Sequence, residues 1–178
     1  MLCKTSLFLY PVIVKKINDS LRMGNDKLFL LRAVEIAGNG IQNGGGPFGA
    51  VVSKDDKIIS EAYNRVVLTS DPTAHAEILA IRQAASVLKS HDLGDCILYS
   101  SCEPCPMCLG AIYWAGIKKV VYSCDRTDAE GAGFSDKLIY EEIMLDPANR
   151  KITFLRITDT GGKEVFRKWD ELENKTPY

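Results

Sequence analysis

Two short stretches of polar and sulfur-bearing residues constrain the fold of this chain more than any other feature. His75 and Glu77 stand two positions apart in "DPTAHAEILAIRQAA". Cys105 and Cys108 stand three positions apart in "SSCEPCPMCLGAIYW". Both stretches open an apolar run with helical spacing, and Pro106 suits the first turn of the second run. A fold that uses both stretches as one site must bring two helix starts together.

Hydrophobic periodicity and turn residues predict alternating helices and strands around these stretches. A first helix is expected to be capped by Asn25 or Asp26 and to end at "NGGGP". "FGAVVSKDDKIISEAYN" predicts a hairpin turning at Asp55-Asp56, and a helix follows from Asp71 to about Leu88. Further strands are expected in "DCILYSS", "KKVVYSC" and "KITFLRIT", and further helices in "PMCLGAIYWA", "DKLIYEEIM" and "KEVFRKWDELENK". The pattern predicts an α/β fold, a three-layer α/β/α sandwich with a mixed five-stranded sheet.

Length and charge limit the organisation and the partners of the chain. Its 178 residues suit one domain, expected at residues 25–178, behind a dispensable extension of residues 1–24. The extension lacks the long apolar run and the cleavage site of a signal peptide and is too short for a membrane span. We therefore expect a cytoplasmic protein with no membrane partner. The 22 basic and 23 acidic residues form no long run of either sign, which argues against nucleic acid as the main partner.

The spacing of the cysteines indicates a metal site. Cys102, Cys105 and Cys108 lie within seven residues, a spacing that favours metal binding over a disulfide framework. His75 and the thiolates of Cys105 and Cys108 would give Zn²⁺ three protein ligands and leave a fourth position open, as in catalytic zinc sites. The alternative is a closed structural site with Cys102 as the fourth ligand, which would leave Glu77 without a role.

The combined pattern H-x-E … P-C-x-x-C is the signature of zinc-dependent nucleobase deaminases. The chain resembles the cytidine-deaminase-like superfamily, and within it the bacterial-type guanine deaminases, from about residue 27 to its end. The stretches "GGPFGAVV", "TSDPTAHAEILAIR", "SCEPCPMCLGAIYWA", "AGFSD" and "NKTPY" carry this resemblance. It implies hydrolysis of guanine, a small purine, to xanthine and ammonia, with Zn²⁺ as cofactor. Glu77 would move the proton to the ring nitrogen and then to the departing amine.

The resemblance also implies a set of substrate-binding residues. These are Asn64, which would hydrogen-bond the purine, and Phe48, Ala76 and Trp114. From the residues alone, Asn64 could equally be a turn residue. Phe48 and Trp114 could equally be core residues.

Two further matches lie near the C-terminus. Asp136 matches an acidic residue that reaches the amino side of the substrate, although it could instead cap a helix. Tyr178 matches an aromatic residue that closes the pocket of the partner subunit, after exchange of the C-terminal segment in a homodimer. Without the resemblance, Tyr178 would be taken for a frayed end.

Three other functions remain open at this point. A tRNA adenosine deaminase shares His75-Ala76-Glu77, Asn64 and the C-x-x-C pattern, but it needs a basic surface for the anticodon loop. Deamination of guanosine is the second alternative. The third alternative is not an enzyme but a non-catalytic binding protein that zinc stabilises.

Overall fold

Four strands form a mixed sheet in the order β2-β1-β3-β4. The computed structural model describes residues 9–177, with side chains from residue 24 onward. The strands are β1 (Gly49–Lys54), β2 (Lys57–Tyr63), β3 (Ile97–Cys102) and β4 (Lys119–Cys124). β1 runs antiparallel to both β2 and β3, and β3 runs parallel to β4. The sheet is therefore mixed, as predicted.

The predicted hairpin joins β1 to β2. Asp55 and Asp56, the two residues between the strands, have φ angles of 49° and 56°. Two successive positive φ angles define the turn whose twist matches that of the flanking strands. The hairpin is thus confirmed, together with its turn position.

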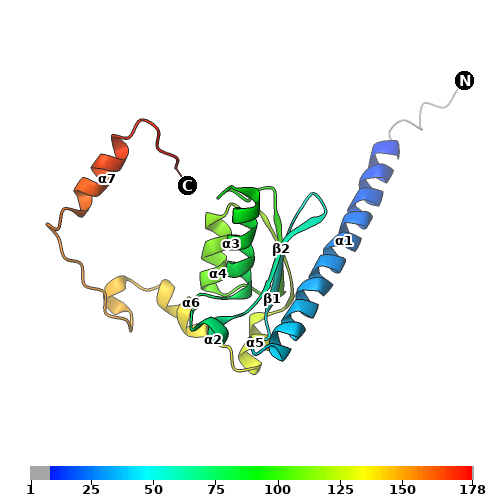
Figure 1. Cartoon of the computed structure of the whole chain (residues 1–178), viewed down its shortest axis with the longest axis horizontal. Helices are drawn as coiled ribbons and strands as arrows, with labels where there is room; N and C mark the ends of the chain where they lie inside the picture. The colour runs from blue at the N-terminus through cyan, green and yellow to red at the C-terminus, as the bar shows by residue number, and fades with distance from the viewer. Residues whose placement is uncertain (1–8, 178) are drawn as a thin grey trace, which may run out of the picture.

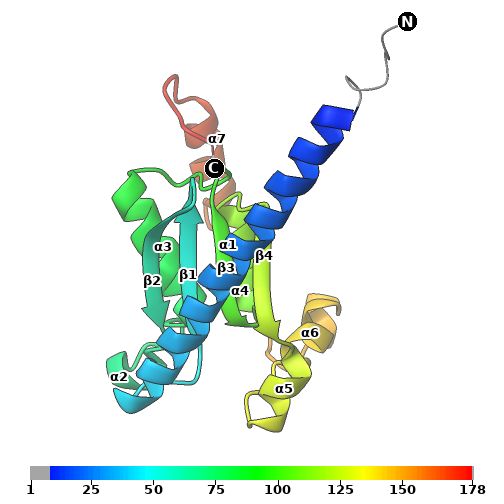
Figure 2. The same ribbon diagram turned by 90° about the vertical axis from the view of Figure 1, so that its right-hand side faces the viewer.

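Helices cover both faces of the sheet. α1 (Leu9–Gln42) lies across one face, and α3 (Ala76–Leu88) and α4 (Pro106–Trp114) lie on the opposite face (Figures 1 and 2). The three-layer α/β/α arrangement is the predicted one. Because α3 and α4 share a face, their N-termini can reach the same end of the sheet.

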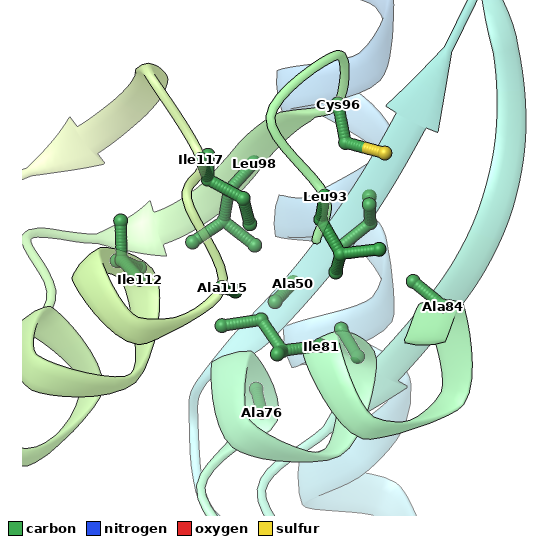
Figure 3. Close-up of a cluster of buried hydrophobic side chains, with 12 residues drawn as sticks. Ala50, Ala76, Ile81, Ala84, Leu93, Cys96, Leu98, Ile112, Ala115 and Ile117 are labelled. Carbon is green, nitrogen blue, oxygen red and sulfur yellow. The ribbon is translucent and has the colours of Figure 1, made fainter. Parts of the chain in front are cut away.

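Apolar side chains fill both spaces between the layers. The larger cluster joins the sheet to α3 and α4 and includes Ala50, Ile81, Leu98 and Ile112 (Figure 3). Side chains of this size each contribute roughly 1.5–3 kcal/mol when fully buried, except alanine, which contributes less. A second cluster packs under α1. There β1 approaches α1 so closely that a Cβ on Gly49 would lie 2.2 Å from a backbone oxygen of the helix.

The predicted start of the first helix is wrong. α1 does not begin at Asn25 or Asp26 but at Leu9, and it runs through both positions. Asp26 caps no helix end because its carboxylate is bonded to the sheet. It accepts a hydrogen bond from Tyr99 at 2.8 Å and pairs with Lys119 at 2.6 Å. The boundary expected at residue 24 therefore falls inside a continuous helix.

The fifth strand, expected in residues 151–158, is not formed, so the sheet has four strands among the described residues. A strand needs a neighbour for its backbone hydrogen bonds, and here the chain leads away from the sheet (Figure 1). The remaining elements are short. They are α2 (Val66–Thr69), α5 (Arg126–Gly131), α6 (Lys137–Ile143), a 3₁₀ turn η1 (Pro147–Asn149) and α7 (Gly162–Asp170).

None of the helices in the described part of the chain combines the length and the apolar character needed to cross a bilayer.

Candidate active site

Both polar stretches occupy the N-terminal ends of helices on the same face of the sheet. His75 is the N-cap residue of α3, and Cys105 is the N-cap residue of α4, three positions after β3 ends. Neither side chain makes a capping hydrogen bond. Pro106 occupies the first turn of α4, where a proline costs no helical hydrogen bond. The two helix starts therefore present their side chains for a purpose other than capping.

The H-x-E spacing works because it spans a helix boundary. Residues two apart inside a helix point to different faces. His75, however, has φ −68° and ψ 152°, an extended conformation, while Glu77 already lies in the first turn of α3. The change of backbone conformation between them lets both side chains turn toward the same place.

His75, Cys105 and Cys108 bring their ligand atoms together. The Sγ atoms of Cys105 and Cys108 are 3.6 Å apart, and each lies 3.6 Å from Nδ1 of His75. Zinc bonded at about 2.3 Å to sulfur and about 2.0–2.1 Å to nitrogen in a tetrahedron needs ligand atoms roughly 3.5–3.8 Å apart. The three side chains therefore fit Zn²⁺, and they supply three of its four tetrahedral positions.

Cys102 lies outside this ligand set. Its Sγ atom donates a hydrogen bond to the backbone oxygen of Asp125 at 3.4 Å. Burial raises the pKa of the Cys102 thiol to about 11, and its sulfur is not among the ligand atoms that lie within 4.8 Å of one another. The geometry thus gives no support to the closed four-ligand site that the sequence left open.

Hydrogen bonding and burial set the charges of the ligands. The hydrogen-bond contact between the two sulfur atoms lowers the pKa of Cys105 to about 4, and His75 adds to this effect. The same hydrogen bond, with burial and the nearby Glu77 carboxylate, raises the pKa of Cys108. The hydrogen bond to Cys105 raises the pKa of His75. Cys105 therefore carries the first negative charge of the set, at a helix N-terminus that stabilises it.

Glu77 is the buried acid beside the ligands, with 5% of its surface exposed. Its Oε1 accepts a hydrogen bond from Ser100 at 3.0 Å, and its Oε2 accepts one from Cys108 at 3.5 Å. Burial raises the pKa of Glu77 above its ordinary value, although the Ser100 hydroxyl opposes the shift. A carboxyl group with a raised pKa can both accept and release a proton, as general acid/base catalysis requires.

A cavity of about 500 Å³ opens beside the ligand set. His75 and Glu77 form part of its wall, and Phe48 and Phe134 form another part. The two phenyl rings meet edge to face, with centroids 5.0 Å apart and planes at 86°. A cavity of this size with apolar walls and a few polar groups suits a small planar molecule.

Asn64 is held rigidly in the cavity wall. Its backbone N–H donates to Phe48 at 2.9 Å, and its carbonyl accepts from Gly46 at 3.1 Å. Its Oδ1 accepts from the N–H of Val66 at 3.2 Å, which is the local turn contact considered for an asparagine at this place. Asn64 thus belongs to the cavity wall and to a turn at once.

Asp136 stands at the N-terminal end of α6 but makes no capping hydrogen bond with its side chain. It lies in the cavity wall instead. Burial raises the pKa of Asp136, and the negative charge of Cys105 adds to the shift. Of the two roles open to this carboxyl group, the geometry favours the one inside the cavity.

Two predicted substrate-binding residues, Ala76 and Trp114, are not brought to the cavity. Ala76 is fully buried in the core under α3. Trp114 ends α4, about 12 Å along the helix axis from Pro106 at 1.5 Å per residue, and 71% of its surface is exposed. Tyr178 lies outside the described residues.

Two residues near the site were missed by sequence reasoning. Phe134 could have been found, because it lies in the "AGFSD" stretch two positions before Asp136. Ser100 gave no such signal. That the Ser100 hydroxyl meets Glu77 follows only from how α3 packs on β3, which no local pattern shows.

Comparison with protein families matches residues 23–124 to the cytidine and deoxycytidylate deaminase zinc-binding region. The chain is 52% identical over 155 residues to a guanine deaminase of Bacillus subtilis, a match that covers 86% of this chain and 99% of that protein. It is 34% identical over 118 residues to a tRNA-specific adenosine deaminase of Buchnera aphidicola, covering 66% of this chain and 78% of that protein.

Solved structures show the same likeness. The X-ray structure of the Bacillus subtilis guanine deaminase matches with a TM-score of 0.83 at 52% identity, over 85% of this chain and 98% of that one. A guanine deaminase structure from Nitrosomonas europaea matches with a TM-score of 0.59 at 36% identity, over 61% of this chain and 64% of that one. The first of these matches reaches well beyond the family region.

Proposed function

This chain belongs to the guanine deaminases of the cytidine and deoxycytidylate deaminase family, and from that membership we infer that it hydrolyses guanine to xanthine and ammonia. It is a zinc-dependent aminohydrolase. One observation carries the assignment: the 52% identity to a guanine deaminase extends over 99% of that protein. The match to the tRNA-specific adenosine deaminase is shorter, at 118 residues, and weaker, at 34% identity.

The residues around the ligand set account for the proton transfers. His75, Cys105 and Cys108 hold the zinc, which when bound supplies the Lewis acidity that makes water nucleophilic near neutral pH. Glu77 takes one proton from the attacking water and delivers it to a ring nitrogen of guanine. It then passes the second proton to the amino group. The bond from C2 to that nitrogen breaks, ammonia leaves, and the water oxygen stays on C2 as the carbonyl of xanthine.

The cavity wall supplies the contacts that orient the purine. We propose that the Asn64 amide hydrogen-bonds the ring and that Phe48 packs against it. The position of Asn64 supports this role, because three hydrogen bonds to neighbouring residues fix it beside Phe48. Asp136 approaches the amino side of the substrate and assists the departure of ammonia. Its place in the cavity wall, without a capping bond, supports that role.

Ammonia release from a panel of substrates tests the assignment. The purified protein is given guanine, guanosine, cytosine and an anticodon stem-loop that carries adenosine. We expect ammonia from guanine. Release from the stem-loop without release from guanine would reverse the assignment in favour of a tRNA adenosine deaminase. Release from guanosine alone would favour the nucleoside as substrate.

We also propose a homodimer that exchanges its C-terminal segments, residues 144–178. This segment leads away from the sheet (Figure 1) and carries apolar side chains that are mostly exposed, among them Leu155 at 81% and Phe166 at 74%. Among the described residues, β4 pairs only with β3, so its outer edge has room for a strand. Residues 151–158 of a second copy would supply that strand, and Tyr178 would reach the partner's cavity.

Complementation tests the exchange. Light scattering should give twice the mass of one chain. A Glu77→Gln chain, coexpressed with a chain that lacks residues 176–178, should form mixed dimers with one intact site. Their activity should exceed the sum of the two parent proteins. An activity equal to that sum would argue against exchange.

We further propose that residues 25–178 form the deaminase domain, that residues 1–24 are dispensable, and that the protein works in the cytoplasm. The cysteines of the described residues are all free thiols, including the two zinc ligands. A reducing compartment keeps them in that state.

A further inference from the structure

Ser100 is a hydroxyl group in an otherwise apolar row. Alternate side chains of β3 face α3 and α4, and among them Leu98 belongs to the core cluster, together with Cys96 just before the strand. Ser100 continues this row with only 1% of its surface exposed. An alanine would fill most of the same space without a polar group. A hydroxyl buried this deeply costs free energy unless it is hydrogen-bonded.

The hydroxyl of Ser100 is bonded to the acid of the site. It donates to Oε1 of Glu77 at 3.0 Å. The other oxygen of that carboxyl group, Oε2, faces the Sγ atom of Cys108 at 3.5 Å. The two oxygens therefore have different surroundings, one tied to the sheet and the other directed to the ligand set.

A glutamate needs such a tie to hold its plane. The terminal torsion of a glutamate side chain is broad, so the carboxyl group turns freely unless a partner stops it. β3 is a suitable anchor because it is paired on both sides: Ser100 lies opposite Ala50 of β1 and Tyr122 of β4. A bond from the centre of the sheet fixes one oxygen more firmly than a bond from a loop would.

We propose that Ser100 is a positioning residue of the deamination, which fixes the Glu77 carboxyl group so that Oε2 faces the zinc ligands and the substrate. The inference rests on the proposed function. Ser100 is not part of the cavity wall, so it acts on the reaction only through Glu77. Proton transfer depends on the distance and angle of the carboxyl group, and a small displacement of it slows the reaction.

Ser60 provides a matched control for a purely structural role. It is likewise a buried strand serine, with 3% of its surface exposed, and its hydroxyl donates to Ala80 of α3 at 2.7 Å. Ser60→Ala removes a buried hydrogen bond to the same helix that carries Glu77. It leaves the carboxyl group and its partners in place.

The experiment compares steady-state kinetics, zinc content and thermal unfolding of the holoenzyme and its variants. Ser100→Ala should lower kcat by roughly 10- to 100-fold, as the loss of a partner that orients a catalytic group does, and should change KM by no more than about twofold. Zinc content should stay at the wild-type level. Ser100→Thr, which keeps the hydroxyl, should recover most of kcat. Ser60→Ala should keep kcat within about twofold of the wild-type value, even if its melting temperature falls as far as that of Ser100→Ala.

A double variant separates positioning from stability. In the Glu77→Gln background, Ser100→Ala should cause no further loss of turnover, because the group it positions is already gone. An unchanged kcat in Ser100→Ala, with guanine turned over normally by the wild type, would overturn this inference alone. A wild-type protein that releases ammonia from no base would overturn the inference and the proposed function together.

Discussion

Glu77 is the residue whose substitution tests the proposed proton transfer most directly. Glu77→Gln keeps the size and the hydrogen bond to Ser100 but removes the group that moves protons. We expect the rate of ammonia release to fall by roughly 100- to 10,000-fold, the range that general acid/base groups contribute. Elemental analysis should find the zinc content unchanged. Undiminished release of ammonia would remove Glu77 from the mechanism.

The identity of the zinc ligands is a second residue-scale prediction. Cys108→Ala removes one corner of the 3.6 Å ligand triangle, so we expect loss of zinc and of activity together. Cys102→Ala is the matched control, because Cys102 bonds to Asp125 and not to the ligand set. It should retain zinc at the wild-type level. Loss of zinc from this control would revive the closed four-ligand site.

Sequence alone predicted the ligand set, since spacing and residue type restrict it strongly. The positions of Cys105 and Cys108 identify a metal pair, and Pro106 identifies the helix start on which they stand. Trp114 shows where this reasoning ends. An aromatic residue in the same stretch suits a pocket equally well on paper, but the length of α4 carries it away from the site.

An ion pair joins two elements that the sequence alone would not bring together. Arg32 of α1 holds Glu61 of β2 with two hydrogen bonds, of 2.6 and 3.0 Å. The hydrogen bond from Arg32 lowers the pKa of Glu61. The ion pair between Arg32 and Glu61 therefore stabilises the fold at neutral pH, and this contribution is lost as the pH falls through the lowered pKa of Glu61. Because the pair is over one-third exposed, we expect it to contribute only about 0.5–1 kcal/mol.

Glu61→Gln measures this contribution. At pH 7 it should lower the melting temperature by about 1–4 °C, and the difference from wild type should vanish once the pH lies below the lowered pKa of Glu61. Asp95→Asn is the control, because the pair of Asp95 with Lys54 is longer, at 3.5 Å, and Asp95 is 81% exposed. The control should match wild type at both pH values. A difference for Glu61→Gln that persists at low pH would mean that the charge of Glu61 is not its cause.

Elements with strong local signals were predicted, and elements that depend on distant contacts were not. The hairpin follows from Asp55 and Asp56, which suit the turn by themselves. The local pattern places the start of the first helix too late, at Asn25 or Asp26, because these residue types favour caps, whereas the Asp26 carboxylate bonds to Tyr99 and Lys119. Residues 151–158 have the composition of a strand, but composition does not supply a neighbouring strand.

For the whole molecule, the N-terminal part of α1 can be tested by truncation. The bonds that join α1 to the sheet begin with Asp26, among the residues whose side chains are described. A chain starting at Met23 should therefore keep turnover near the wild-type value, as judged by ammonia release. A chain starting at Phe29 lacks Asp26 and leaves Tyr99 and Lys119 without their partner, so it should unfold at a lower temperature. Equal stability of the two would show that this anchor contributes nothing.

The C-terminus is the second feature to test on the whole molecule. Removal of residues 176–178 deletes Tyr178, which is proposed to close the partner's cavity as a lid, and leaves every described strand and helix intact. We expect a lower kcat/KM for guanine with an unchanged melting temperature. A truncated protein as fast as the full chain would exclude a lid at this end.

The candidate zinc ligands and Glu77 lie between His75 and Cys108, whereas Phe134 and Asp136 of the cavity wall come after β4. The cavity wall also includes Phe48 and Asn64, which come before His75, so the wall is built from two blocks that flank the block with the metal ligands. Substitutions in the two flanking blocks could therefore change the substrate while the metal ligands stay the same. This division of labour offers protein engineers the same route.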